Sequence, residues 1–128
     1  MFPKFLLKRM YEKESLKMNK NSDGFNFIIK NNIANGNVVE VYLLSINDEE
    51  VPFNDITIKN ETQEVTTDKI TPENPVELKK GVNTLFTIKK NNLLDFVDKE
   101  VKIQMKFKVQ VRDSKITIDF NFEDVLKG

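Results

Sequence analysis

The chain of 128 residues contains no cysteine, no histidine and no tryptophan, and it has only four glycines and four prolines. Without cysteine, disulfides, thiolate catalysis and zinc–thiolate sites are excluded. Without histidine, the commonest metal ligand and general base is missing, together with every nucleophile–histidine arrangement. The sequence therefore predicts no catalytic residue and no cofactor, and we expect no autonomous enzymatic activity.

The formal net charge is zero, because 20 basic residues balance 20 acidic ones. No overall field draws the protein toward nucleic acid or a membrane. The charges are unevenly spread: residues 48–77 hold nine carboxylates against two lysines, and residues 2–20 hold six basic residues against two glutamates. This asymmetry either orients a partner or reflects solvated loops and edges.

Long hydrophobic runs are absent as well. No apolar segment approaches membrane-spanning length, and charge interrupts the opening residues 1–9 too early for a secretory signal. We therefore predict a cytoplasmic protein with no membrane partner.

The most regular pattern present is strict alternation over residues 100–123, which is strand periodicity. If Asp113 and Ser114 form the loop of a hairpin, Val111 faces Ile116 and Lys108 lies opposite Asp119. All the apolar side chains then share one face: Val101, Ile103, Met105, Phe107, Val109, Val111, Ile116, Ile118, Phe120 and Phe122. Twelve residues would span roughly 40 Å, so we expect a bend, a bulge or a projecting end that pairs with something else.

Short strands separated by turn signals describe the rest of the chain. Strands are expected near residues 25–30, 38–46, 55–59, 63–67 and 84–89, with a helical turn near 93–97. The run 38–46 is apolar on both faces and should be central. Residues 5–17 fit either a helix or a strand, and the hairpin signal after them favours a strand. In that turn, residues 21–24, Gly24 is suited to positive φ.

These patterns predict an all-β fold, an antiparallel β-sandwich of jelly-roll or immunoglobulin-like type with roughly seven to nine strands. A single domain over residues 1–128 is expected from the length. Closure into a barrel is left open.

Two motifs suggest cation chemistry. Residues 19–24 resemble the start of a calcium-binding loop, but Asn19 replaces the first aspartate and Lys30 the twelfth-position glutamate, so a hairpin turn is favoured. The carboxylates Asp48, Glu49, Glu50 and Asp55 are weak candidates for a hard-cation site or an acid–base pair. A solvated hairpin tip is the favoured interpretation, since a polar turn does not separate two pKa values.

Interaction candidates are of two kinds. The outward row Lys102, Lys106, Lys108, Arg112 and Lys115 has the charge to follow a phosphate backbone, but a solvated sheet face is favoured because the hairpin aromatics point inward. Aromatic residues near termini and turns are candidate protein-interface anchors: Phe2, Tyr42, Phe53 and Phe96.

Several segments carry a family resemblance: residues 5–17, Asp23-Gly24-Phe25-Asn26-Phe27, residues 30–32 and residues 47–52. Together they resemble a small β-rich archaeal family of unknown function. A more distant similarity is to the small (β) subunit of C-glycoside deglycosidases. It rests on the order of four features: a serine, Gly-Phe-x-Phe, an acidic turn before Glu-Val-Pro, and a late glycine. That resemblance implies a chain that packs on a larger catalytic subunit, and it assigns no functional residue.

The favoured hypothesis is a non-catalytic β-sandwich that binds another protein or copies of itself. The first alternative is a carbohydrate- or cation-binding module, or the small subunit of a carbohydrate-active enzyme. The second is single-stranded nucleic-acid binding.

Overall fold

The computed structural model describes residues 9–20, 23–91 and 93–128. In chain order its elements are β1 (Lys17–Met18), β2 (Gly24–Lys30), β3 (Gly36–Ile46), β4 (Glu49–Glu50), η1 (Phe53–Asp55), β5 (Ile56–Lys59), β6 (Glu64–Thr66), η2 (Thr67–Lys69), β7 (Val76–Leu78), β8 (Asn83–Lys89), η3 (Leu93–Asp95), β9 (Glu100–Val111) and β10 (Ser114–Val125).

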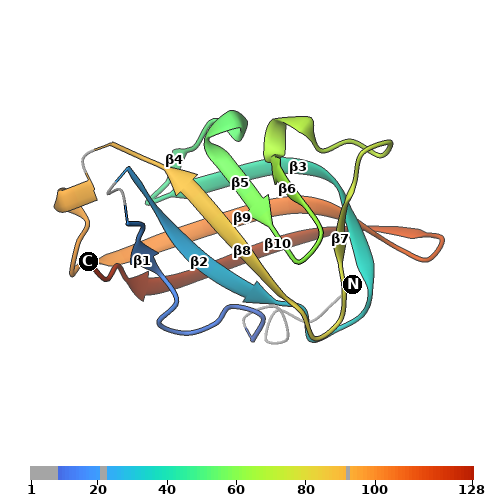
Figure 1. Cartoon of the computed structure of the whole chain (residues 1–128), viewed down its shortest axis with the longest axis horizontal. Helices are drawn as coiled ribbons and strands as arrows, with labels where there is room; N and C mark the ends of the chain where they lie inside the picture. The colour runs from blue at the N-terminus through green and yellow to red at the C-terminus, as the bar shows by residue number, and fades with distance from the viewer. Residues whose placement is uncertain (1–8, 21–22, 92) are drawn as a thin grey trace.

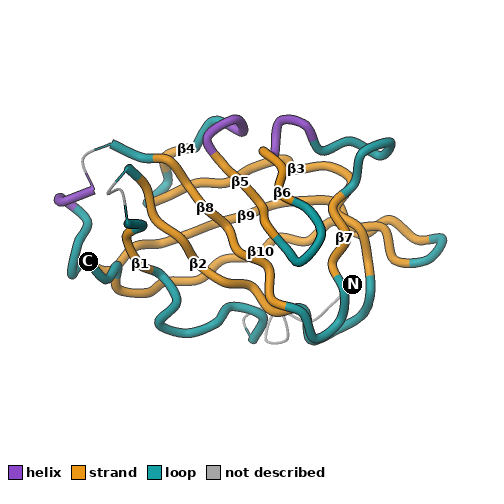
Figure 2. The backbone as a smooth tube through the Cα atoms, in the orientation of Figure 1, coloured by secondary structure: helices purple, strands orange, loops and turns teal. Residues whose placement is uncertain are grey.

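The strands form two antiparallel layers (Figures 1 and 2). One sheet has the order β1-β2-β8-β5-β6; the other has the order β10-β9-β3-β4, with β7 pairing the start of β3. The predicted all-β sandwich is confirmed, with ten strands in the described part of the chain. The predicted turn near residues 93–97 is the 3-10 helix η3.

Alternating side chains of both layers meet in the core. Phe25, Phe27 and Ile29 of β2 are buried, as the period-two pattern requires. Phe27 stacks on Phe86 of β8 with ring centroids 5.1 Å apart and meets Phe122 of β10 edge-on at 5.2 Å. Aromatic contacts therefore join the two sheets across the core.

The long hairpin is confirmed, but its predicted register is wrong by two residues. The turn consists of Arg112 and Asp113, so Val111 pairs with Ser114, and Asp119 pairs with Lys106 instead of Lys108. Arg112 has φ 56°, the positive value that tight hairpin turns need at their first central residue. A shift of two keeps every side chain on its face, so the hydrophobic pattern cannot distinguish the two registers.

The expected irregularity lies in β3 and not in the hairpin. Between β3 and β9 the register shifts at Val38/Glu40 and again at Val41/Leu43, whereas β9 and β10 pair without a shift. As predicted, β3 is central, with β9 on one side and β4 and β7 on the other. The β9–β10 tip projects beyond the other strands at the right of Figure 1. The predicted projecting end is therefore present, and its pairing partner stays a prediction.

Two local predictions need correction. Gly24 has no positive φ; it begins β2, where an added Cβ would lie 2.1 Å from the carbonyl oxygen of Ile88, so close backbone approach is what requires glycine. Within the predicted strand of residues 5–17, the described part has turns and an isolated bridge at Tyr11, and regular pairing begins only at Lys17. Residues 5–8 lie outside the described residues.

Among the described residues, no helix is long and apolar enough to cross a membrane.

Candidate functional site

One end of the sandwich gathers loops from both sheets. An open depression of about 540 Å³ is lined there by the β3–β4 region, the start of β2 and the end of β8: Asp23, Glu49, Glu50, Val51, Pro52, Asp55, Lys89, Lys90 and Asn91. We call this region the loop end and define it as Asp23, residues 47–55, residues 89–91 and residues 93–99. Loops at the ends of a sandwich are free to vary without disturbing the core, which suits them to binding.

Tight turns place the acidic side chains of the loop end. Asn47 and Asp48 have φ values of 49° and 69°, as in the primed turns that join two-residue hairpins, and this reverses β3 into β4. The Asn47 side-chain oxygen accepts a 2.9 Å hydrogen bond from the backbone N–H of Lys102, and Lys102 Nζ lies 3.8 Å from Asp48 Oδ1. The turn is thereby fixed to the start of β9.

The structure brings three of the four predicted carboxylates to one depression. Glu49, Glu50 and Asp55 line it, while Asp48 instead pairs with Lys102 outside it. Sequence reasoning missed Asp23, Lys89 and Lys90, because only the fold brings β2 and β8 beside β4. No group of three or more acidic residues in the described ranges is arranged to hold a metal ion.

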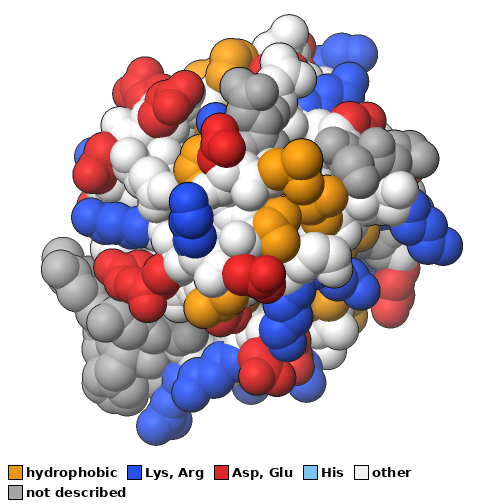
Figure 3. Space-filling model, turned by 90° about the vertical axis from the view of Figure 1, so that its left-hand side faces the viewer, with side chains coloured by type: hydrophobic (Ala, Val, Ile, Leu, Met, Phe, Trp, Pro, Cys, Tyr) orange, Lys and Arg blue, Asp and Glu red, His pale blue; other side chains and the backbone are white. Residues whose placement is uncertain are grey.

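The loop that carries η3 adds apolar surface to the loop end. Leu94 is 81% exposed, the highest value among the exposed large hydrophobic residues of the described chain. Lys90 Nζ lies 5.1 Å from the ring centroid of Phe96, so this loop adjoins the charged depression. Figure 3 shows apolar side chains grouped on this end of the molecule among acidic and basic ones. Such a mixture of apolar and charged groups is typical of protein-binding surfaces.

Among the remaining interface candidates, Phe53 lies within the loop end, whereas Tyr42 lies on β3 and Lys106 and Lys108 lie on β9. Tyr42 is 38% exposed, and Lys108 Nζ lies 5.6 Å from its ring centroid. A hydrogen bond from Lys108 to Tyr42 is the main reason that the pKa of Lys108 is raised. Lys106 is paired with Asp119 in the register of the hairpin, and Phe53 is 37% exposed in η1. Phe2 lies outside the described residues.

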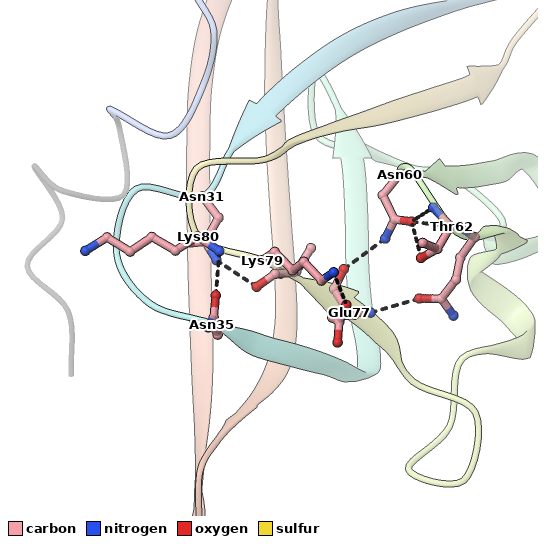
Figure 4. Close-up of polar contacts among 9 residues, drawn as sticks. Asn31, Asn35, Asn60, Thr62, Glu77, Lys79 and Lys80 are labelled. Atoms are coloured by element: carbon pink, nitrogen blue, oxygen red, sulfur yellow. Dashed lines mark hydrogen bonds and ion pairs between the residues drawn. The ribbon is translucent and has the colours of Figure 1, made fainter.

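A second polar group lies at the other end of the sandwich, where side chains fix loops to β7 (Figure 4). Asn31 donates to the carbonyl oxygens of Ala34 at 2.6 Å and Leu78 at 3.0 Å, and Asn60 donates to the carbonyl oxygen of Glu77 at 2.9 Å. These amides already have protein partners, so the network explains local structure and offers no ligand site.

The interior offers little space. The apolar void between the sheets measures about 30 Å³ and is lined by residues such as Ile58, Phe86 and Met105. Sites for small molecules are usually several hundred cubic ångströms in volume, so this void is a packing gap.

Comparison with known proteins gives one family. The family model described as "Hydroxymethylglutaryl-CoA reductase, N-terminal domain" matches residues 6–126. No curated protein matches the chain. The comparison supports neither an archaeal family nor the resemblance to the small subunit of C-glycoside deglycosidases.

Proposed function

Because the chain belongs to the hydroxymethylglutaryl-CoA reductase N-terminal domain family, we propose that it is a non-catalytic accessory domain that binds another protein through the loop end. The family is named for one domain of a reductase. The proposed partner is therefore the catalytic part of such an enzyme, on the same chain or on another. The proposed setting is the cytoplasm, which suits a chain without cysteine.

The exposure of Leu94 carries this proposal. A leucine that is 81% exposed keeps most of its apolar surface in water, at a cost of roughly 25 cal/mol for each Å². Burial of that side chain against a partner recovers this free energy. Leu94 is also held on the short 3-10 helix η3, which limits the conformational entropy lost on binding.

The charges of the loop end fit the rim of a protein interface. Acidic residues Glu49, Glu50 and Asp55 lie in the same depression as Lys89 and Lys90. Solvated charges of both signs add little affinity, but they select partners of complementary pattern and orient their approach. The loop end therefore combines an apolar anchor with a charged surround.

The test is binding of the purified chain to a purified reductase catalytic unit, measured by biolayer interferometry. Leu94→Asp should weaken binding at least about tenfold, because a hot-spot contact is lost and a charge is desolvated. Glu61→Lys, an exposed change on the β5–β6 loop, is the matched control and should bind like the parent chain. Absence of binding by the parent chain, or equal binding by Leu94→Asp, would contradict the proposal.

A carbohydrate- or cation-binding role is a second candidate, since Glu49, Glu50, Asp55 and Asp23 line one open depression. Carboxylates hydrogen-bond to sugar hydroxyls, which favours the carbohydrate form, because the described carboxylates are not grouped as metal ligands. A thermal-shift series with calcium, magnesium, manganese and simple sugars tests this role. An unchanged melting temperature throughout the series would remove it, whereas a shift abolished by Glu50→Gln would support it.

A further inference from the structure

The outer edge of β10 differs from the other sheet edges. At those edges lie β1 and β4 with two residues each and β6 and β7 with three, which limits unwanted pairing. Strand β10 has twelve residues, contains no proline and pairs with β9 without a register shift. Among the strands formed by residues 9–20, 23–91 and 93–128, none pairs with the outer side of β10. This long edge can therefore act as a template for another strand.

The turn geometry shows which backbone groups point outward. In a two-residue hairpin the residues that flank the turn share hydrogen bonds, and inward and outward groups then alternate. The backbone N–H and C=O groups of Ser114 and of every second residue after it therefore point toward β9. Those of Lys115, Thr117 and Asp119 point away from it. Lys127 continues this parity: its N–H donates to Leu16 at 3.2 Å, on the outer side of the strand.

The free part of the edge ends before the C-terminus of β10. The Tyr11 hydroxyl donates to Asp124 Oδ2 at 2.6 Å, and the N–H of Glu14 donates to the same atom at 2.9 Å. Tyr11 also stacks on Phe122 at 3.8 Å. The N-terminal segment therefore covers the last residues of β10 and leaves the run Lys115–Asn121 beside the projecting tip.

We propose that this run pairs antiparallel with the same run of a second copy of the chain, about a two-fold axis at Thr117. In that register Lys115 of each copy lies opposite Asp119 of the other. Two opposite-charge cross-strand pairs then form on the outer face of the sheet, where the side chains of Lys115, Thr117 and Asp119 are exposed. Roughly six backbone hydrogen bonds join the copies, and the two β10-containing sheets become one continuous sheet.

Neighbouring registers lack this complementarity. With the axis at Asp119, the two Asp119 carboxylates face each other. Glu123 must then pair with Lys115 of the other copy, although Glu123 lies beside the end of β10 that the N-terminal segment covers. With the axis at Ile116, Asp113 lies opposite Asp119. With the axis at Ile118, Lys115 faces the uncharged Asn121. Like charges directly opposite destabilise a sheet, so the charge pattern selects Thr117.

This interface is separate from the loop end, which lies at the opposite end of the sandwich from the β9–β10 tip (Figure 1). The proposal therefore goes beyond the proposed function, and either one stands if the other fails.

Crosslinking tests the register directly, because the chain has no cysteine of its own. Two hydrogen-bonded residues on paired strands have Cα atoms about 5.5 Å apart, within disulfide range, so Thr117→Cys should give a covalent dimer under mild oxidation. Asn121→Cys is the control, since its two copies would lie roughly 27 Å apart. Crosslinking of Asn121→Cys as fast as Thr117→Cys would overturn the register.

Sedimentation equilibrium tests the association itself. The parent chain should be a dimer, and Lys115→Glu should raise the dimer dissociation constant about tenfold by placing glutamate opposite Asp119. Thr117→Pro removes one outward N–H without touching the β9 ladder, so it should keep the parent circular dichroism spectrum while becoming monomeric. A parent chain that stays monomeric, or a dimer unaffected by both changes, would overturn the proposal.

Discussion

The hydroxyl of Tyr11 donates a 2.6 Å hydrogen bond to Oδ2 of Asp124, 113 positions later in the chain. The same Tyr11 ring stacks on Phe122 with its centroid 3.8 Å away and an interplanar angle of 13°. The backbone N–H of Glu14 completes the contact by donating to Asp124 at 2.9 Å. An otherwise irregular N-terminal segment is thus fixed to the last strand, and it covers one end of that strand's outer edge.

Tyr11→Phe should lower the free energy of unfolding by about 1–3 kcal/mol, because Asp124 loses a partly buried, charge-assisted hydrogen bond while the ring packing remains. Urea denaturation followed by circular dichroism measures this difference. Tyr42→Phe removes a hydroxyl from an exposed ring and should change the stability by less than about 0.5 kcal/mol. Equal losses in the two variants would show that the Tyr11 hydroxyl contributes nothing beyond a surface contact.

The hydrogen-bonded pair Tyr11 and Asp124 should make the stability of the fold depend on pH in both acid and alkali. Burial alone would raise the pKa of Asp124, but hydrogen bonds from Tyr11 and two backbone N–H groups lower it below its ordinary 3.8. This stabilisation is present above that ordinary pKa and is lost as pH falls through the lowered value. Burial, and then the hydrogen bond to Asp124, raise the pKa of Tyr11 above its ordinary 10.0, so its contribution is lost as pH rises above that value.

Denaturation of the parent chain and Asp124→Asn across the pH range checks this dependence. The two unfolding free energies should differ most near neutrality and converge in acid, as the pH falls through the lowered pKa of Asp124. Tyr11→Phe should lack the loss of stability above about pH 10. A constant difference between parent and variants at every pH would contradict the assigned ionisations.

The sequence predicted the strands well where one face is buried. Alternation in β9 and β10 identified their inward residues because core burial imposes a period of two. The hairpin register was predicted wrongly because Arg112 takes positive φ although it is neither glycine nor asparagine. The role of Gly24 was missed because its neighbour Ile88 is 64 positions away and comes close only in the folded sheet.

The loop end could be predicted only in part. The acidic run at Asp48, Glu49 and Glu50 is visible in the sequence as a charged turn. The lysines that line the same depression, Lys89 and Lys90, lie at the end of β8 in the other sheet and just after it, so only the sandwich topology brings them beside the acidic turn. The exposure of Leu94 has no sequence signal either, since a Leu-Leu pair between polar residues equally describes a buried turn.

Glu100→Gln should stabilise the protein at neutral pH. A side-chain hydrogen bond with Glu123, and then the charge of that carboxylate, raise the pKa of Glu100 above its ordinary 4.5. A raised carboxyl pKa means that stability is greatest below the ordinary value and falls as pH rises through the folded-state value. Removal of the charge therefore helps at pH 7, and the benefit should disappear in acid.

Melting temperatures of the parent chain and Glu100→Gln at neutral and acidic pH measure this effect. Glu64→Gln, an exposed change on β6, is the control and should show no such pH-dependent gain. A Glu100→Gln variant that melts below the parent at neutral pH would show that repulsion between Glu100 and Glu123 is not felt in the fold.

Gly24→Ala should destabilise the sandwich by at least about 2 kcal/mol, because backbone cannot move aside as a flexible side chain can. The added Cβ would lie 2.1 Å from the Ile88 carbonyl oxygen and 2.9 Å from its carbon. Gly81→Ala is the matched comparison: its φ is 85°, but nothing lies within 4 Å of the added atom. That variant should lose only about 1 kcal/mol from backbone strain. A Gly81→Ala variant less stable than Gly24→Ala would contradict this order.

Asn31→Ala should be among the more damaging polar substitutions. Asn31 is 6% exposed, and its amide donates to Ala34 and Leu78 while its oxygen accepts from the N–H of Ile33 at 3.1 Å. Alanine leaves these buried backbone groups without partners, which should cost about 2–3 kcal/mol of unfolding free energy in urea denaturation. Asn35→Ala is the control. It removes one exposed hydrogen bond, which Asn35 Oδ1 accepts from the N–H of Lys80 at 2.7 Å, and should cost about 1 kcal/mol or less. Equal costs would mean that the Asn31 contacts are replaced by water, and that the β7–β8 turn does not depend on this side chain.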